Sequence, residues 1–135
     1  PRPPVAKTPG PQPRLLLVED DQLVRRSVAR WLGAEGYEVL AVADGAEALA
    51  VLESATEIAC VVSDISMPRL DGEQLAHALN KRRPELPLVL VSGNRSMSPD
   101  LLASPTRAFV PKPLTQLELR QAIARVTHAG LRATR

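Results

Sequence analysis

The stretch LLLVEDDQ, residues 15–22, places four apolar side chains directly before three acids, Glu19, Asp20 and Asp21. A short, continuous apolar run is typical of a strand that is covered on both faces of a parallel sheet. Carboxylates gathered at the end of a buried strand repel one another unless another charge compensates them. The stretch therefore predicts a strand that leads into a functional site. Asp21 is also well placed to cap a following helix.

Four further apolar segments resemble the first in length and composition. They are YEVLAV (37–42), IACVV (58–62), LPLVLV (86–91) and AFV (108–110). Helical segments with recognisable start signals are expected between these strands. The signals are capping residues three positions before an acid or amide: Asp44 with Glu47, Asp71 with Gln74, and Thr115 with Glu118.

The first helix is expected at about residues 22–35, with Val24, Val28 and Leu32 buried and a stop at Gly36. Leu75 and Leu79, and then Leu119, Ile123 and Val126, have the spacing of buried helix faces. The segment 96–105 contains two prolines and several polar residues, which predicts only a short or irregular fourth helix.

Strands that alternate with helices indicate an α/β fold with right-handed crossovers. We expect a single doubly wound (flavodoxin-like) domain with a five-stranded parallel sheet in the order 2-1-3-4-5 and helices on both faces. In this order the chain reverses direction between strands 1 and 3. Ligands collect beyond the carboxyl ends of those two strands.

Acidic side chains follow both of these strands. Glu19 and Asp20 come after the first strand, and Asp64 comes after the third, in VVSDISMPRLDG. A hard divalent cation such as Mg²⁺ would compensate their repulsion, since it prefers oxygen ligands and also brings phosphate oxygens with it. Ser92 follows the fourth strand and Lys112 the fifth, which adds a hydroxyl and a cation. The pattern predicts a phosphoryl site.

These motifs resemble the receiver domain of two-component response regulators: the acid pair, DISMPRLDG, the SG after strand 4 and the KP after strand 5. The resemblance covers residues 14–129. It implies that Asp64 is the phosphoacceptor, that Glu19, Asp20, Asp64 and the backbone carbonyl of Ser66 hold Mg²⁺, that Lys112 pairs with the phosphate, and that Ser92 and Phe109 form a switch. It also implies a cis Lys112–Pro113 bond.

The implied function is to take a phosphoryl group from the phosphohistidine of a histidine kinase or a histidine phosphotransfer domain. Such a domain phosphorylates and dephosphorylates itself and is not a turnover enzyme. One alternative is a receiver-fold interaction module or phosphate sink without conformational output. Another is an aspartyl phosphatase, although its nucleophile would lie on strand 1 in a D-x-D pattern, which EDDQ does not supply.

Composition limits the classes of partner and site. The 135 residues are 44% hydrophobic, which fits one domain with an aliphatic core, and no apolar run approaches the length of a membrane span. The net charge of +2 includes Arg2, Lys7 and Arg14 at the start, so the rest of the chain does not suggest a nucleic-acid binder. The single cysteine, Cys60, fits a buried thiol in the cytoplasm.

The proline-rich residues 1–13 are expected to form a flexible linker or tail, and residues 130–135 a disordered tail. A linker before the domain and no effector domain after it suggest the C-terminal receiver of a hybrid sensor histidine kinase, whose full-length form could be membrane-attached. A stand-alone regulator is the alternative. As an isolated domain we expect a monomer without membrane contact.

Overall fold

The computed structural model describes residues 13–54, 57–65, 72–93 and 104–133. The elements in these ranges are β1 (Arg14–Val18), α1 (Gln22–Ala34), β2 (Glu38–Val42), α2 (Gly45–Glu53), β3 (Cys60–Asp64), α3 (Gly72–Arg82), β4 (Leu88–Ser92), β5 (Arg107–Pro111) and α4 (Gln116–Ala133). Each predicted strand is present, with bounds that differ by up to two residues. The prediction of an irregular helix within 96–105 falls largely outside the described residues.

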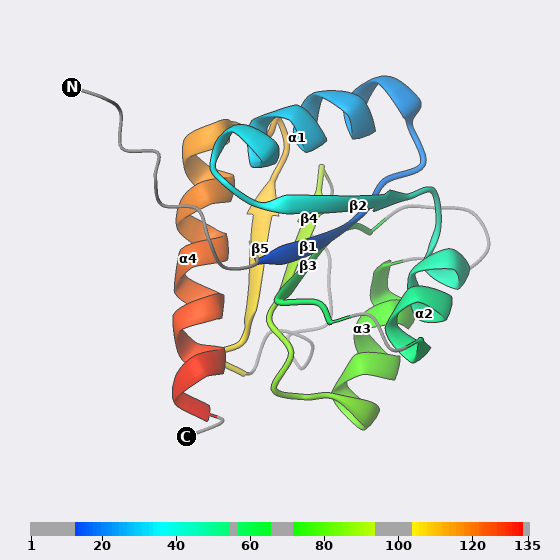
Figure 1. The fold of residues 1–135 in the computed structure, drawn as a ribbon, viewed down its shortest axis with the longest axis vertical. Helices are drawn as coiled ribbons and strands as arrows, with labels where there is room; N and C mark the ends of the chain where they lie inside the picture. Colours follow the sequence, from blue (N-terminus) through cyan, green and yellow to red (C-terminus); the bar gives the residue numbers. More distant parts are fainter. Residues whose placement is uncertain (1–12, 55–56, 66–71, 94–103, 134–135) are drawn as a thin grey trace.

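The strands form one parallel sheet in the order β2-β1-β3-β4-β5 (Figure 1). This confirms the doubly wound, flavodoxin-like fold. Val18 pairs with Ser63 across β1 and β3, and Asp64 pairs with Val91 across β3 and β4. Because all five strands run in the same direction, their carboxyl ends meet at one edge of the sheet.

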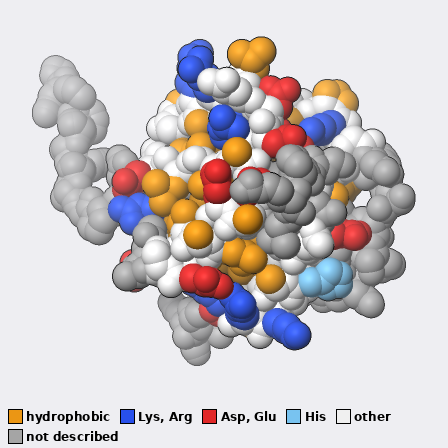
Figure 2. All heavy atoms as spheres, turned by 90° about the vertical axis from the view of Figure 1, so that its right-hand side faces the viewer, with side chains coloured by type: hydrophobic (Ala, Val, Ile, Leu, Met, Phe, Trp, Pro, Cys, Tyr) orange, Lys and Arg blue, Asp and Glu red, His pale blue; other side chains and the backbone are white. Residues whose placement is uncertain are grey.

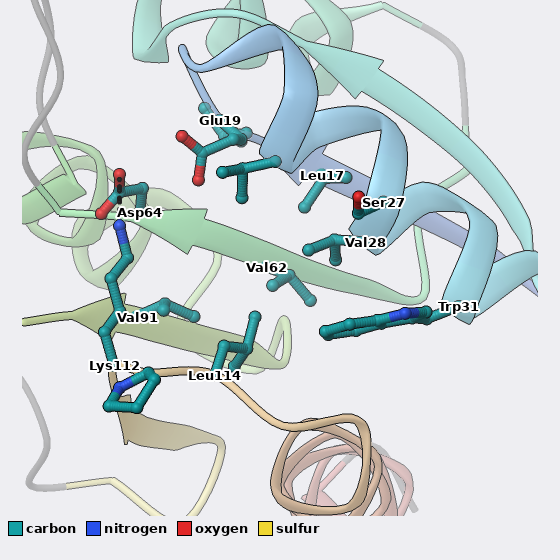
Figure 3. A pocket seen from close by; sticks show the side chains of 13 residues that line it. Leu17, Glu19, Ser27, Val28, Trp31, Val62, Asp64, Val91, Lys112 and Leu114 are labelled. Carbon is teal, nitrogen blue, oxygen red and sulfur yellow. Dashed lines mark hydrogen bonds and ion pairs between the residues drawn. The ribbon is translucent and has the colours of Figure 1, made fainter.

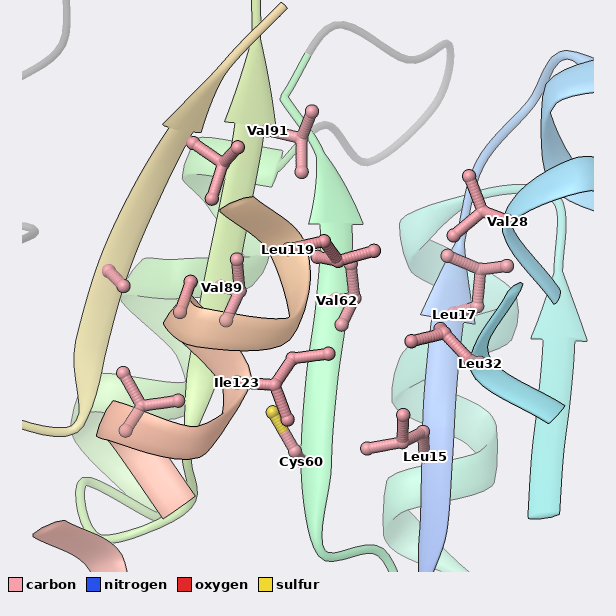
Figure 4. Packing of buried hydrophobic residues seen from close by; sticks show 14 residues of the cluster. Leu15, Leu17, Val28, Leu32, Cys60, Val62, Val89, Val91, Leu119 and Ile123 are labelled. Carbon is pink, nitrogen blue, oxygen red and sulfur yellow. The ribbon is translucent and has the colours of Figure 1, made fainter. Parts of the chain in front are cut away.

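Side chains that alternate along the strands divide the core into two layers. Leu15 and Leu17 point to the face that α1 and α4 cover, where the buried thiol of Cys60 also lies (Figure 4). Leu16 and Val18 point to the face that α2 and α3 cover. The strands read as continuous apolar runs because helices cover both faces.

The helix start and stop signals mostly act as predicted. Asp21 accepts hydrogen bonds from the backbone N–H groups of Leu23 and Val24, and Asp44 and Thr115 accept from Glu47 and Glu118. The capping pair of Asp71 and Gln74 involves a residue outside the described ranges. After α1, Gly36 adopts a φ of 102°, a left-handed conformation that favours glycine.

The buried face of α1 is shorter than predicted. Val28 and Leu32 are buried, but Val24 is 37% exposed, so the prediction of its burial was wrong. Val24 lies in the first turn of the helix, where it lines a pocket at the carboxyl edge of the sheet. The predicted stripes of α3 and α4, in contrast, are buried throughout.

The last helix continues to Ala133 and so passes residue 129, where the sequence analysis placed the end of the domain. None of the helices in the described ranges combines the length and the apolar character that crossing a membrane requires.

The amino-terminal edge of the sheet contains a buried charge that the sequence did not indicate. Arg107, the first residue of β5, is 3% exposed. Its guanidinium donates to the Asn80 side chain of α3 and to the backbone carbonyl of Leu86 before β4. One of its nitrogens, Nη2, has no hydrogen-bond partner. Arg107 thus ties β5 to the end of α3 and to the segment that follows it.

The first turns of α4 offer a matched test of the core assignment, because Leu119 is 1% exposed and Leu117 is 51% exposed. Leu119→Ala should lower the free energy of unfolding by about 2–5 kcal/mol, since it removes buried methyl groups and leaves a cavity. Leu117→Ala should change it by less than about 0.5 kcal/mol. Urea denaturation measures both values, and equal losses would contradict the assignment of the helix faces.

Candidate functional site

Three carboxylates lie together beyond the carboxyl ends of β1 and β3. Glu19 and Asp20 follow β1 directly, and Asp64 is the last residue of β3. One carboxylate oxygen from each lies within 4.8 Å of the others. Glu19 and Asp64 are buried, whereas Asp20 is exposed. The register of the two strands therefore brings together the acids that the sequence analysis had paired.

The Glu19 carboxylate is fixed and poorly solvated. Its Oε2 accepts a hydrogen bond of 3.0 Å from the backbone N–H of Asp21. Burial raises its pKa from 4.5 to about 6; the negative charges of Asp64 and Asp20 add to this shift, while the Asp21 hydrogen bond and Lys112 oppose it. The raised pKa thus reflects mainly the burial of this carboxyl group, and the two neighbouring acids contribute less.

Lys112 supplies a positive charge at the same edge. It follows β5, and its Nζ lies 3.3 Å from Oδ2 of Asp64, an ion pair visible in Figure 3. The Lys112 backbone N–H donates to the carbonyl of Ser92, so the lysine is also tied to the end of β4. The Lys112–Pro113 bond is cis, as the resemblance implied.

The two proposed switch residues occupy β4 and β5. Ser92 ends β4 and is 4% exposed, one position beyond Val91, the partner of Asp64. Phe109 lies in the middle of β5, is half-buried, and packs against the core layer of α2 and α3. Ser66, whose carbonyl was expected to be a metal ligand, lies outside the described residues.

A pocket of about 290 Å³ opens beside these charges. Its walls come from α1, from the central strands and from the segment Lys112–Leu114. In Figure 3, Asp64, Lys112 and Glu19 lie at one end of the pocket and Trp31 at the other, with apolar side chains between them. The site thus combines an ionic end with an apolar wall.

Arg25 also contacts the acidic turn, a contact that the sequence analysis did not predict. It is half-buried, and its Nη1 donates a hydrogen bond of 2.8 Å to the backbone carbonyl of Glu19. The spacing contained a signal for this contact, because side chains of a helix tilt toward its N-terminus. Arg25 stands in the first turn of α1, from which it can reach back over the acidic turn.

The donor set suits a small divalent cation. The carboxylate oxygens converge from the turn after β1 and from the end of β3, and such oxygens are the ligands that Mg²⁺ prefers. Mg²⁺ usually keeps several waters and binds through few protein groups. A bound cation would offset the repulsion that Asp64 and Asp20 exert on the Glu19 carboxylate. Among the described residues, Lys112 forms an ion pair with Asp64 but not with Glu19 or Asp20, so it compensates the cluster only in part.

Comparison with known proteins agrees with this geometry. The family model described as "Response regulator receiver domain" matches residues 15–124. Sensor kinase CckA of Brucella abortus is 37% identical over 112 residues, which cover 81% of this chain but 12% of that protein. Response regulator MprA of Mycobacterium sp. (strain KMS) is 36% identical over 108 residues, or 78% of this chain and 46% of that protein. The chain thus spans less than half the length of both relatives.

A solved structure has the same fold. Response regulator TrrA of Thermotoga maritima, in complex with Mg(2+)-BeF, superposes with a TM-score of 0.75 at 26% identity, covering 84% of this chain and 98% of that one. The family match extends over most of the chain and includes each described residue of the acidic cluster, the lysine and the switch pair. The chain therefore belongs to the response regulator receiver domains of two-component systems.

Proposed function

We propose that this domain accepts a phosphoryl group on Asp64 from the phosphohistidine of a histidine kinase or a histidine phosphotransfer domain. The observation that carries this proposal is the meeting of Asp64 with a lysine on one side and two further acids on the other, in a chain of the receiver family. Among the three acids, Asp64 is assigned as the nucleophile because it forms the ion pair with Lys112.

The transfer forms a bond between a carboxylate oxygen of Asp64 and phosphorus, while the bond from phosphorus to the donor nitrogen breaks and the electron pair leaves with the imidazole. Lys112 stabilises the charge of the transferring group. The product is an acyl phosphate, which water later hydrolyses, so the domain modifies itself and does not turn over a free substrate.

Glu19, Asp20 and Asp64 would hold Mg²⁺, together with the Ser66 carbonyl predicted by resemblance. When bound, the cation neutralises phosphoryl oxygens and lowers the repulsion between an anionic nucleophile and an anionic donor. The hydrogen bond from the Asp21 N–H already holds the Glu19 carboxylate in place.

Ser92 and Phe109 would convert phosphorylation into a change of conformation. A phosphoryl group on Asp64 would offer a new acceptor to the Ser92 hydroxyl, and Phe109, which is half-buried, would move toward the space that the hydroxyl leaves. If the switch does not operate, the domain is better described as a phosphate sink or interaction module.

The similarity to CckA, which is named a sensor kinase, supports a hybrid-kinase context for this chain, and the similarity to MprA supports a response regulator. We propose no nucleic-acid partner for this domain. In the view of Figure 2, the acidic and basic side chains of the described residues lie in small groups with hydrophobic side chains between them, and no continuous basic area spans this face.

The nucleophile can be tested with acetyl phosphate and Mg²⁺. The wild-type domain should gain one phosphoryl group that hydroxylamine removes, as expected for an acyl phosphate, and Asp64→Asn should gain none. Asp21→Asn is the matched control, because asparagine also caps helices and Asp21 is outside the cluster. Intact-mass spectrometry reads the result, and undiminished labelling of Asp64→Asn would disprove the assignment.

The metal site can be tested by thermal unfolding. Mg²⁺ at ten times its Kd should stabilise the wild-type domain by about 1.4 kcal/mol. Asp20→Asn should lose most of this increment and, without metal, should be more stable than wild type because it relieves repulsion. Asp21→Asn should retain the increment. Equal Mg²⁺ shifts in Asp20→Asn and wild type would mean that the cation binds elsewhere.

The switch can be tested with beryllofluoride and Mg²⁺ as a mimic of the acyl phosphate. Amide NMR shifts of Phe109 and its neighbours in β5 should be large in wild type and reduced in Ser92→Ala, while shifts near Asp64 persist in both. Ser27→Ala, which removes a hydroxyl from the pocket wall on α1, should behave as wild type. No movement of Phe109 in wild type would favour a sink over a switch.

A further inference from the structure

The acidic turn between β1 and α1 is held through its backbone. The N–H of Glu19 donates to the carbonyl of Val42 in β2 at 3.0 Å, and the carbonyl of Glu19 accepts from Arg25 at 2.8 Å. Asp21 is fixed in turn by its bond to the Glu19 carboxylate and by capping α1. These contacts hold Glu19 and Asp21, the residues on either side of Asp20, in fixed positions.

Asp20 is the exposed member of the acid cluster, so its direction depends on the backbone that carries it. The carbonyl of Glu19 and the N–H of Asp20 belong to one planar peptide group. The hydrogen bond from Arg25 fixes the rotation of that plane. It thereby fixes the direction in which the Asp20 side chain leaves the turn.

The contact of Arg25 is directed at the backbone and does not neutralise the acids. Among the described residues, Arg25 forms no ion pair with a carboxylate, and its charge is not among the causes that shift the pKa of Glu19. Charge alone would make a guanidinium beside a divalent-cation site unfavourable, because like charges repel. A favourable effect of Arg25 on cation binding must therefore come from geometry.

We infer that Arg25 is a positioning residue for the cation site, which acts through the Glu19–Asp20 peptide to hold the Asp20 carboxylate toward Glu19 and Asp64. The inference rests on the proposed function, because it presumes that these three acids bind Mg²⁺. The neighbouring arginine, Arg26, is exposed and has the same charge on the same helix, which makes it a matched control.

The test is a calorimetric titration of the metal-free domain with MgCl₂, using Arg25→Met, Arg26→Met and wild type. Methionine keeps an unbranched apolar stem of helix-forming character but cannot donate a hydrogen bond. Arg25→Met should weaken Mg²⁺ binding about tenfold, the lower range for loss of a group that orients a metal ligand. Arg26→Met should bind Mg²⁺ as tightly as wild type or more tightly, since it only removes a positive charge.

Amide NMR of the metal-free proteins gives a second readout. In Arg25→Met the signals of Asp20 and Asp21 should shift while those of the buried Val28 and Leu32 stay in place, which separates a rotated turn from a damaged helix. Arg26→Met should leave the turn unchanged. Unchanged or tighter Mg²⁺ binding in Arg25→Met, or equal weakening in both variants, would overturn the inference.

The two proposals can fail separately. If Asp20→Asn binds Mg²⁺ as wild type does, the metal site itself is wrongly assigned. If Asp20→Asn loses Mg²⁺ while Arg25→Met retains it, the site is correct and only the role of Arg25 is refuted.

Discussion

The parallel pairing of β1 with β3 is the constraint on which the site depends. The pairing of Val18 with Ser63 places the residues that follow each strand beside one another, so Glu19 and Asp20 meet Asp64. Both strands lie in the interior of the sheet, and helices cover both faces. The fold thus places three carboxylates at the carboxyl edge of its central strands, where burial is the main cause of the raised pKa of Glu19.

Much of this arrangement could be predicted from the sequence, because it depends on patterns among residues that are close together in the chain. Continuous apolar runs identified the strands, and Asp21, Asp44 and Thr115 act as caps in the structure. The alternation of strands and helices along the chain then restricted the fold to few topologies. Once the strand order is known, the ends of the strands decide which side chains meet, and the ion pair between Asp64 and Lys112 follows from that order.

The sequence could not show how much of each side chain the surrounding elements shield from solvent in the folded domain. Helical periodicity placed Val24 on the buried face of α1, but the pocket at the end of the sheet leaves it exposed. The contact of Arg25 with Glu19 was compatible with the helical spacing, but the sequence did not distinguish it from an arginine that extends into solvent. Arg107 is buried because its donors find Asn80 and the Leu86 carbonyl, partners that lie far from it in sequence.

The position of Lys112 after an edge strand has a consequence for local opening. β5 pairs with β4 alone, whereas the strands that carry the acids have neighbours on both sides. Partial unfolding that detaches β5 would separate Lys112 from Asp64 and leave the acids in place. The ion pair therefore connects the edge of the sheet to its centre. The proposed phosphorylation would add negative charge at Asp64 and so strengthen its attraction to Lys112. If the proposal holds, hydrogen exchange in β5 would slow when Asp64 is phosphorylated.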